Sequence, residues 1–311
     1  MHAPVLRYFA EVARAGSIRQ AARQLNVAAS AVNRQVLKLE QELGLELFER
    51  VPSGLRLTPA GEIVLRHARA TLYEFDRLKT ELDALQGVRT GLVRLASLDS
   101  LMVDLLPRTI TAFHRSNPAV RFAVTACGPG EVANRVANGD ADIGIAFDIE
   151  QHAGVTVAAD IASPIRAMVS PDHPLAEAPA VTLLDCAKYP LLFQEDTQPI
   201  RTLLDMELAE AKTASRHLLV ANNLSLIKGL VCAGIGVAFY TSIGFVNELS
   251  EGSVVAVPLK ERRLSDLRLT LLQPRERRPT PAAAALIQHL ADALSAFKDG
   301  TVDRSRRGDA C

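Results

Sequence analysis

The feature that most constrains the fold of this chain is a pair of short helical segments separated by a tight turn near its N-terminus. Ser17 can cap the first segment, over 18–25, and Asn26 can adopt the left-handed conformation that a tight turn between helices requires. The second segment runs over about 30–43, has apolar side chains at helical spacing, and is ended by Gly44. Such a pair can hold the exposed N-terminal half of its second helix in the major groove of DNA.

The exposed side of this second helix carries the residues that we expect to contact DNA: Ala29, Ser30, Asn33, Arg34 and Lys38. Asn33 can bind adenine through two hydrogen bonds and Arg34 can bind guanine in the same way, whereas Ala29 can only pack against a thymine methyl group. Two short strands, 47–50 and 55–57, follow around a turn. They predict a hairpin, or wing, that brings Arg50 and Arg56 to phosphate.

Charge is distributed unevenly along a chain that has 311 residues and no net charge. Residues 1–90 contain 13 Lys and Arg against 10 Asp and Glu, and the remainder contains 22 against 25. A locally basic head favours a polyanionic partner, although a solvated helix face would have a similar composition. The chain as a whole, 48% apolar and 23% charged, has the composition of a globular protein rather than a fibrous or disordered one.

One long helix is predicted from Pro59 to about Gln86. About 28 residues at 1.5 Å each would extend for about 40 Å. Its apolar side chains repeat every three or four positions: Leu65, Ala68, Leu72, Phe75, Leu78, Leu82 and Leu85. Such a stripe has to be buried, and a second copy of the helix is the natural partner, although packing against its own domain stays open. Residues 87–91 then predict a hinge.

The segment 16–62 resembles the winged helix-turn-helix of LysR-type transcriptional regulators. The resemblance rests on Ala21-Ala22, Leu25, Leu39-Glu40, Leu43-Gly44, Leu47-Phe48-Glu49-Arg50 and Leu57-Thr58-Pro59-Ala60-Gly61. It implies a DNA-binding regulator that pairs its long helices in a dimer and presents two recognition helices to half-sites about one helical turn apart. Two positions depart from the family, because Ala29 stands where a polar residue is usual and Asn33 where Ser is usual. The operator sequence therefore cannot be carried over.

Beyond residue 90, strand-like runs alternate with helical segments, which predicts an α/β architecture with mostly parallel sheets. Strands are expected at 92–98, 120–127, 142–147, 165–170, 191–194, 237–240, 254–257 and 267–272. Helices are expected at 101–116, 131–138, 199–211, 224–233, 242–249 and 281–297. The order suggests two lobes, and the resemblance implies the same layout, a domain like periplasmic solute-binding proteins with a cleft between its lobes.

The expected architecture is therefore multidomain: an all-α winged helix-turn-helix head with a long linker helix, then a two-lobed α/β domain like a periplasmic binding protein. The expected bounds are 1–58 for the head, 59–90 for the linker helix and hinge, 91–300 for the effector domain and 301–311 for a mobile tail. Lobe one would comprise 91–162 with 266–300, and lobe two 163–265.

In such lobes, ligands bind beyond the carboxyl ends of strands, where helix N-termini present free N–H groups. This rule predicts effector contacts from Ser100, Leu101, Pro129, Phe147 and Asn223. The resemblance adds that Ser100 matches a hydroxyl position that many family members use for a ligand. Ser100 and Asn223 could equally be helix caps, and Phe147 could belong to the core. The effector is expected to be a small organic acid or an aromatic metabolite, although the candidate cation, Arg166, could lie at the surface.

Other classes of protein have less support. The seven His and four Cys show no metal-ligand spacing, and neither a nucleotide-binding glycine motif nor a nucleophile elbow is present, so we expect no cofactor and no catalysis. A solute-binding protein would account for 91–300 but not for the basic head, and it would normally carry an export signal. Cys127 could sense oxidants, but a small buried side chain is the simpler interpretation.

The sequence also bears on location and partners. No apolar run is long enough to span a membrane, and the N-terminus lacks the apolar core of a secretory signal. We therefore expect a cytoplasmic protein. Its expected partners are double-stranded promoter DNA, a small-molecule effector, further copies of itself in a dimer or tetramer, and RNA polymerase.

Overall fold

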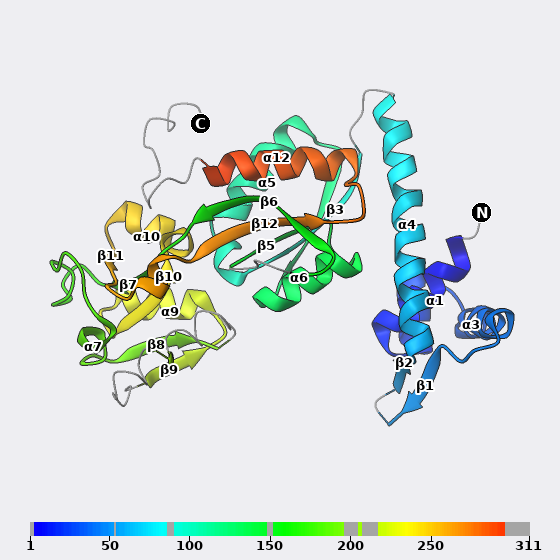
Figure 1. The fold of residues 1–311 in the computed structure, drawn as a ribbon, viewed down its shortest axis with the longest axis horizontal. Helices are drawn as coiled ribbons and strands as arrows, with labels where there is room; N and C mark the ends of the chain where they lie inside the picture. The colour runs from blue at the N-terminus through cyan, green and yellow to red at the C-terminus, as the bar shows by residue number, and fades with distance from the viewer. Residues whose placement is uncertain are drawn as a thin grey trace. The chain divides into compact units, whose positions relative to one another are not determined.

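A computed structural model describes residues 3–52, 54–85, 90–147, 152–195, 205–206 and 217–295. The chain forms two compact units, a helical N-terminal unit and an α/β unit. The first contains α1 (Ala3–Ala15), α2 (Ile18–Leu25), α3 (Ala29–Leu43), β1 (Phe48–Val51), β2 (Gly54–Leu57) and α4 (Pro59–Leu85) (Figure 1). This order of helix-turn-helix, hairpin and long helix is the one that the sequence predicts.

Local preferences of single residues account for the turns of the head. The Ser17 hydroxyl accepts a hydrogen bond from the Gln20 N–H at 3.5 Å and caps α2. Asn26 ends α2 in the left-handed conformation, with φ of 54°, and Gly44 ends α3 with φ of 67°. These three predictions are confirmed. The helices enclose a small core of buried residues, namely Val12, Ala21, Ala22, Val32 and Val36.

The hairpin packs closely against the start of α4. The Thr58 hydroxyl donates to the Glu46 carbonyl at 2.8 Å and accepts from the Gly61 N–H at 3.0 Å. A side chain at position 61 would collide with the Leu47 carbonyl and with Leu57, which is why a glycine stands there. The wing and the long helix are therefore held together as one piece.

The apolar stripe of α4 is buried only along its first half. Leu65 and Ala68 pack with Phe9 in a second small core of the head. In the second half Phe75 is half-buried, and the leucines are exposed, by 49% for Leu78, 53% for Leu82 and 85% for Leu85. The alternative that the whole helix packs against its own domain therefore does not hold for this second half.

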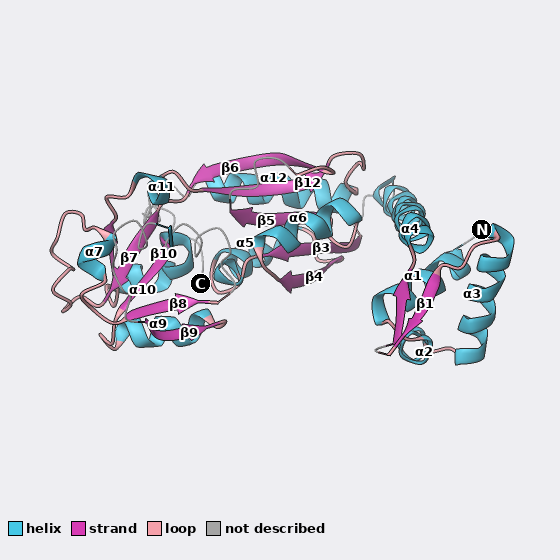
Figure 2. Cartoon of the chain, turned by 60° about the horizontal axis from the view of Figure 1, so that its bottom comes forward, coloured by secondary structure: helices cyan, strands magenta, loops and turns pink. Residues whose placement is uncertain are grey.

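The α/β unit contains two five-stranded sheets. The first, in the order β4-β3-β5-β12-β6, consists of β3 (Gly91–Ser97), β4 (Val120–Ala126), β5 (Ile143–Phe147), β6 (Val155–Ala162) and β12 (Arg268–Pro274). The second, in the order β11-β7-β10-β8-β9, consists of β7 (Ile165–Val169), β8 (Leu191–Gln194), β9 (His217–Ala221), β10 (Val237–Thr241) and β11 (Val255–Pro258). Each sheet with its helices forms one lobe (Figure 2).

Both sheets are mixed, and the prediction of mostly parallel sheets is wrong. In the first sheet, β3 runs parallel to β4 and β5, whereas β12 runs antiparallel to β5 and β6. In the second, β8 runs parallel to β9 and β10, whereas β7 runs antiparallel to β10 and β11. The antiparallel pairs arise because the chain crosses between the lobes twice, after β6 and before β12, so that β7 and β12 each begin where their neighbours end.

Helices cover both faces of the first sheet. The α/β unit contains α5 (Leu105–Ser116), α6 (Pro129–Asn138), α7 (Leu183–Cys186), α9 (Leu224–Cys232), α10 (Val246–Glu251), α11 (Arg262–Ser265), α12 (Pro281–Ser295) and the 3-10 segments η1 (Asp99–Leu101) and η2 (Ser242–Phe245). Side chains of α5 and α12 pack in the larger core on one face of this sheet, and those of α6 in a smaller core on the other. The larger core continues into the second lobe.

Several elements differ from the sequence prediction. The helix expected from residue 101 begins at Leu105, because η1 and a turn come first. The sequence does not predict β6 and β9, since both lie at sheet edges and carry apolar residues on the exposed face as well, namely Val157, Leu218 and Val220. The helix expected at 199–211 falls outside the described residues except at 205–206, and the hinge over 87–89 and the tail over 301–311 also fall outside them.

Candidate functional site

The exposed face of α3 carries most of the predicted DNA contacts. Four of them are exposed, namely Ser30, Asn33, Arg34 and Lys38, and Ala29 is half-buried. Arg34 forms no ion pair with any residue that the structure describes, so its guanidinium group can bind a base or a phosphate. Lys38 lies 3.7 Å from Glu42, but both side chains are exposed and such a pair contributes little stability.

The N-terminus of α3 has no side-chain cap. Ala28 occupies the cap position and has no polar atom to accept hydrogen bonds from the first turn. The N–H groups of that turn therefore keep an exposed partial positive charge at the end of a 15-residue helix. Such an end suits a phosphate group, which adds to the case for α3 as the DNA-facing helix.

The two arginines of the wing differ in their surroundings. Arg50 is exposed and has no ion-pair partner in the described part of the chain. Arg56 donates from Nε to a carboxylate oxygen of Glu49 at 2.6 Å, because these two residues lie directly opposite each other in the hairpin. The Glu49 carboxylate therefore offsets the charge of Arg56 and competes with phosphate for its guanidinium group.

Sequence reasoning misses two further cations of the head. Arg19 and Arg23 lie exposed on α2, and neither forms an ion pair within the described ranges. The sequence shows them only as part of a basic stretch. Which side of a short helix faces outward depends on how α2 packs against α1 and α3.

The two lobes meet where η1 and the start of α5 face η2, α10 and the N-terminus of α9, and we call this region the lobe junction. Ser100 lies in η1 with 8% of its surface exposed, and its hydroxyl forms no hydrogen bond with a described residue. Gly244 of η2 faces it, since a β-carbon at Gly244 would lie 3.5 Å from the Ser100 Cβ. Ser100 is therefore not a helix cap, and its hydroxyl can bind a ligand.

The other predicted effector contacts have structural roles in this conformation. Asn223 is exposed and accepts a hydrogen bond from the Leu226 N–H at 3.0 Å, which caps α9. Leu101 and Phe147 belong to the larger core, with 0% and 3% of their surface exposed. Pro129 is buried at the first position of α6, where its missing N–H costs nothing.

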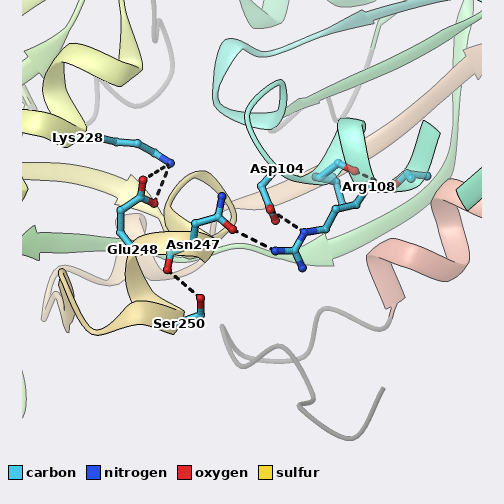
Figure 3. A network of polar contacts seen from close by, with 8 residues as sticks. Asp104, Arg108, Lys228, Asn247, Glu248 and Ser250 are labelled. Carbon is cyan, nitrogen blue, oxygen red and sulfur yellow. Dashed lines mark hydrogen bonds and ion pairs between the residues drawn. The ribbon is translucent and has the colours of Figure 1, made fainter. Parts of the chain in front are cut away.

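Two hydrogen bonds that described side chains make at the junction join the two lobes. An Asp99 carboxylate oxygen in lobe one accepts a hydrogen bond from the N–H of Leu224, the first residue of α9, at 3.3 Å. Arg108 of α5 is held by Asp104 at 2.7 Å and donates to the Asn247 side-chain oxygen of α10 at 3.1 Å (Figure 3). Any change in the angle between the lobes must therefore stretch or replace these contacts.

A buried ion pair lies beside the second contact. The Lys228 ammonium of α9 is 2.9 and 3.0 Å from the two carboxylate oxygens of Glu248, and Lys228 is only 5% exposed (Figure 3). The Phe245 ring lies 5.1 Å from the same ammonium. On the other side of the junction, the second carboxylate oxygen of Asp104 is buried and has no hydrogen-bond partner in the described structure.

The second sheet adds three polar residues at its junction end. The Tyr240 hydroxyl donates to the Gln194 side-chain oxygen at 2.9 Å. Burial, and then the nearby Asp99 charge, raise the pKa of the Tyr240 phenol far above its usual value, so Tyr240 stays a donor. Arg166 is half-buried and lies directly opposite Tyr240 in the β7–β10 pair. The sequence could not place Arg166, because only strand pairing brings it beside Tyr240.

Other chemistries have little support in the described residues. Burial, and then the Glu131 charge, raise the pKa of the Cys127 thiol, which disfavours the thiolate that oxidants attack. No three His, Cys, Asp or Glu side chains of the described ranges gather as metal ligands do. None of the described helices has both the length and the apolar character needed to cross a membrane.

Comparison with known proteins agrees with this architecture. The family "Bacterial regulatory helix-turn-helix protein, lysR family" matches residues 5–62, and the "LysR substrate binding domain" matches residues 86–295. The transcriptional dual regulator GltC of Bacillus subtilis is 31% identical over 89% of this chain and 92% of its own length. A probable nitrogen assimilation transcriptional activator of Synechococcus elongatus is 27% identical over 92% and 93%.

Solved structures share the fold. A full-length OxyR variant from Pseudomonas aeruginosa has a TM-score of 0.71 at 22% identity, over 97% of this chain and 96% of its own. The regulator CbnR, solved in complex with its target DNA, has a TM-score of 0.59 at 21% identity, over 94% and 100%.

A winged helix-turn-helix head followed by a two-lobed binding domain defines a transcriptional regulator that responds to a small molecule, rather than an enzyme. The two family matches and the relative that is 31% identical narrow this class to one family. The chain belongs to the LysR family of transcriptional regulators.

Proposed function

We propose that this chain binds promoter DNA through α3 and the wing, and that an effector at the lobe junction alters this binding. The observation that supports DNA binding is the exposed face of α3. Arg34 lies on this face without an ion-pair partner in the described chain, and the nearby N-terminus of α3 has no side-chain cap. Ala29, Ser30, Asn33 and Lys38 complete the recognition face, and Arg50 and Arg56 contact the flanking phosphates.

The proposal extends to assembly and organisation. The exposed second half of the α4 stripe is the surface through which two copies pair, and pairs of dimers form a tetramer. The domain bounds are those given above: the head over 1–58, the linker over 59–90 and the effector domain over 91–300. The regulator acts in the cytoplasm. When the effector binds, the changed geometry of the DNA-bound regulator alters the contact between the promoter and RNA polymerase.

The effector half of the proposal centres on Ser100. Its hydroxyl is nearly buried, has no partner among the described residues and faces the opposite lobe across Gly244. Asn223 adds an exposed amide at the N-terminus of α9. Leu101, Pro129 and Phe147, which are buried in this conformation, would contact the effector only after the lobes move. A small organic acid or aromatic metabolite can alter DNA binding there only if it binds two lobe geometries with different affinities.

A gel-shift titration of the full chain tests the DNA-binding half. The probe is the fragment upstream of the gene for this chain, with a scrambled fragment of equal length as the control. We expect the upstream fragment to be retained at least tenfold more tightly at about 0.15 M salt, where electrostatic binding alone is weakened. Equal affinity for both fragments, with and without pooled metabolites, would contradict the proposal.

A further inference from the structure

The lobe junction contains an arginine whose position the sequence could not predict. In β7, Ile165, Ala167 and Val169 face the larger core, so Arg166 lies on the other face of the strand together with Met168. Tyr240 pairs with Arg166 on one side, and Tyr240 packs in the core beneath α9. Arg166 therefore lies on the α9 face of the second sheet, at the end of β7 that enters from the crossing.

This arginine is half-buried and forms neither an ion pair nor a hydrogen bond with any residue in the described ranges. A guanidinium group that is partly removed from water and lacks an anion loses hydration without compensation. Its planar set of N–H donors matches the two oxygens of a carboxylate. Arg166 therefore has the environment of a cation that receives an external anion.

An anion reaches the same place from the other lobe. The described contact of the Asp99 carboxylate is the hydrogen bond from the Leu224 N–H, and at 3.3 Å this bond is long. Asp99 lies close enough to the Tyr240 hydroxyl for its charge to act on that phenol. Leu224, which donates to Asp99, packs in the same core as Tyr240, so Asp99 approaches the face of the second sheet on which Tyr240 and Arg166 are neighbours.

Two other cations described at the junction already have partners. Arg108 is paired with Asp104 and bonded to Asn247, and Lys228 is paired with Glu248. Asp99 and Arg166, in contrast, form no ion pair with each other or with another described residue. One unpaired negative charge therefore comes from lobe one and one unpaired positive charge from lobe two.

From this arrangement we infer that the effector is a zwitterion of the α-amino acid class, whose ammonium group binds Asp99 and whose carboxylate binds Arg166. The Ser100 hydroxyl supplies a further hydrogen bond. This inference rests on the proposed function, because it takes the lobe junction as the effector site. A ligand with both charges would link the lobes, whereas a simple acid or a simple amine would engage one lobe only.

Isothermal titration of the full chain with the twenty proteinogenic amino acids tests the inference. Each amino acid that binds is compared with its N-acetyl form, which lacks the ammonium group, and with its amide, which lacks the carboxylate. We expect at least one amino acid to bind and both blocked forms to bind at least tenfold more weakly.

Variants assign the two charges. Asp99→Asn and Arg166→Met should each weaken the amino acid at least tenfold, and Arg166→Lys should recover part of the loss because it keeps the charge. Arg115→Met is the matched control, since Arg115 is an exposed cation at the far end of α5, and it should bind as the parent does. Circular dichroism and retained DNA binding show that each variant is folded.

Two contrary results separate the inference from the proposed function. If no amino acid binds, or if the blocked forms bind as well as the free amino acid, the effector is not a zwitterion. The proposed site would still stand if a simple acid then bound the parent and not Ser100→Ala. A ligand that alters DNA binding could instead bind all three variants, Ser100→Ala, Asp99→Asn and Arg166→Met, as tightly as the parent. The junction would then not be the effector site, and both the proposed function of the junction and the zwitterion inference would be wrong.

Discussion

At the scale of single residues, the DNA-binding surface is defined by which cations are already paired. Arg34 and Arg50 are exposed and without ion-pair partners in the described chain, whereas Arg56 is bonded to Glu49. An exposed pair of this kind contributes little to stability, but it competes directly with phosphate for the guanidinium group. The same sequence feature, a basic residue in the head, therefore has different consequences at different positions.

Replacing the cation of the recognition helix tests whether it reads sequence. Arg34→Ala should weaken binding to the upstream promoter fragment by about 1–3 kcal/mol if the guanidinium group binds a base edge. Gel-shift titrations on specific and scrambled DNA measure the loss. An equal loss on both fragments would show that Arg34 contacts phosphate only.

Releasing the wing arginine should strengthen binding. Glu49→Gln replaces the carboxylate that holds Arg56 by a neutral amide. We therefore expect a severalfold higher affinity for DNA and an increase of about one in the magnitude of the slope of log affinity against log salt concentration. Asp172→Asn removes the same charge from an exposed site in lobe two and is the control. An unchanged slope in Glu49→Gln would mean that Arg56 does not reach the DNA.

At the scale of elements, the function of the head depends on two features of α4: its contact with the wing and its exposed apolar stripe. The wing is joined to α4 through Thr58 and Gly61, and α4 extends beyond the head with an exposed apolar stripe. The contacts of Thr58 and Gly61 fix the wing relative to α4, and the exposed stripe provides a surface for another copy of the chain. Loss of either should impair DNA binding for a different reason.

Gly61→Ala should destabilise the head. The added methyl group would overlap the Leu47 carbonyl, and relieving that overlap costs about 1–3 kcal/mol. Urea denaturation followed by circular dichroism measures the change. Gly130→Ala is the control, because nothing lies within 4 Å of a β-carbon there and the substitution should be neutral or slightly stabilising.

Charging the exposed stripe should separate assembly from folding. Leu78→Glu combined with Leu82→Glu places two carboxylates on the second half of α4, so we expect monomers with unchanged helix content. Analytical ultracentrifugation measures the association state. Leu184→Glu, at an exposed leucine of α7, should leave assembly intact. If the double variant still forms dimers, pairing uses another surface.

At the scale of the whole molecule, the α/β unit couples two lobes through few polar contacts. The bonds from Asp99 to Leu224 and from Arg108 to Asn247 join residues that are 125 and 139 positions apart in the chain. The continuous core and the paired crossing segments, where the Ser163 N–H donates to the Leu267 carbonyl at 2.8 Å, keep the lobes together. A ligand at the junction thus acts on a small number of contacts.

Ser100→Ala tests this coupling most cleanly. It removes a hydroxyl that has no partner in the described chain, so folding and DNA binding should be unchanged while the response to the effector is lost. Gel-shift titrations of DNA with the variant, with and without the amino acid that binds best, measure both DNA binding and the response to the effector. Asn223→Ala is a poorer probe, because Asn223 also caps α9 and its loss costs about 1 kcal/mol. A normal response in Ser100→Ala would remove Ser100 from the site.

The sequence by itself determined the features that depend on neighbouring residues. The cap at Ser17, the left-handed turns at Asn26 and Gly44, the hairpin and the long helix all follow from local conformational preference and helical spacing. The division between a basic head and an α/β body could be predicted for the same reason. Family membership was equally visible in the motif residues of 16–62.

Only the tertiary structure decided strand direction and the composition of the lobe junction. Edge strands such as β6 carry apolar residues on the exposed face too, as Val157 shows, so their sequence alternates only weakly. Whether a pair of strands is parallel depends on where the chain crosses between the lobes. Asp99, Arg166 and Tyr240 come from separate segments whose proximity is created by packing. No local sequence pattern marks them as neighbours, because the interactions that bring them together are strand pairing and packing between segments far apart in the chain.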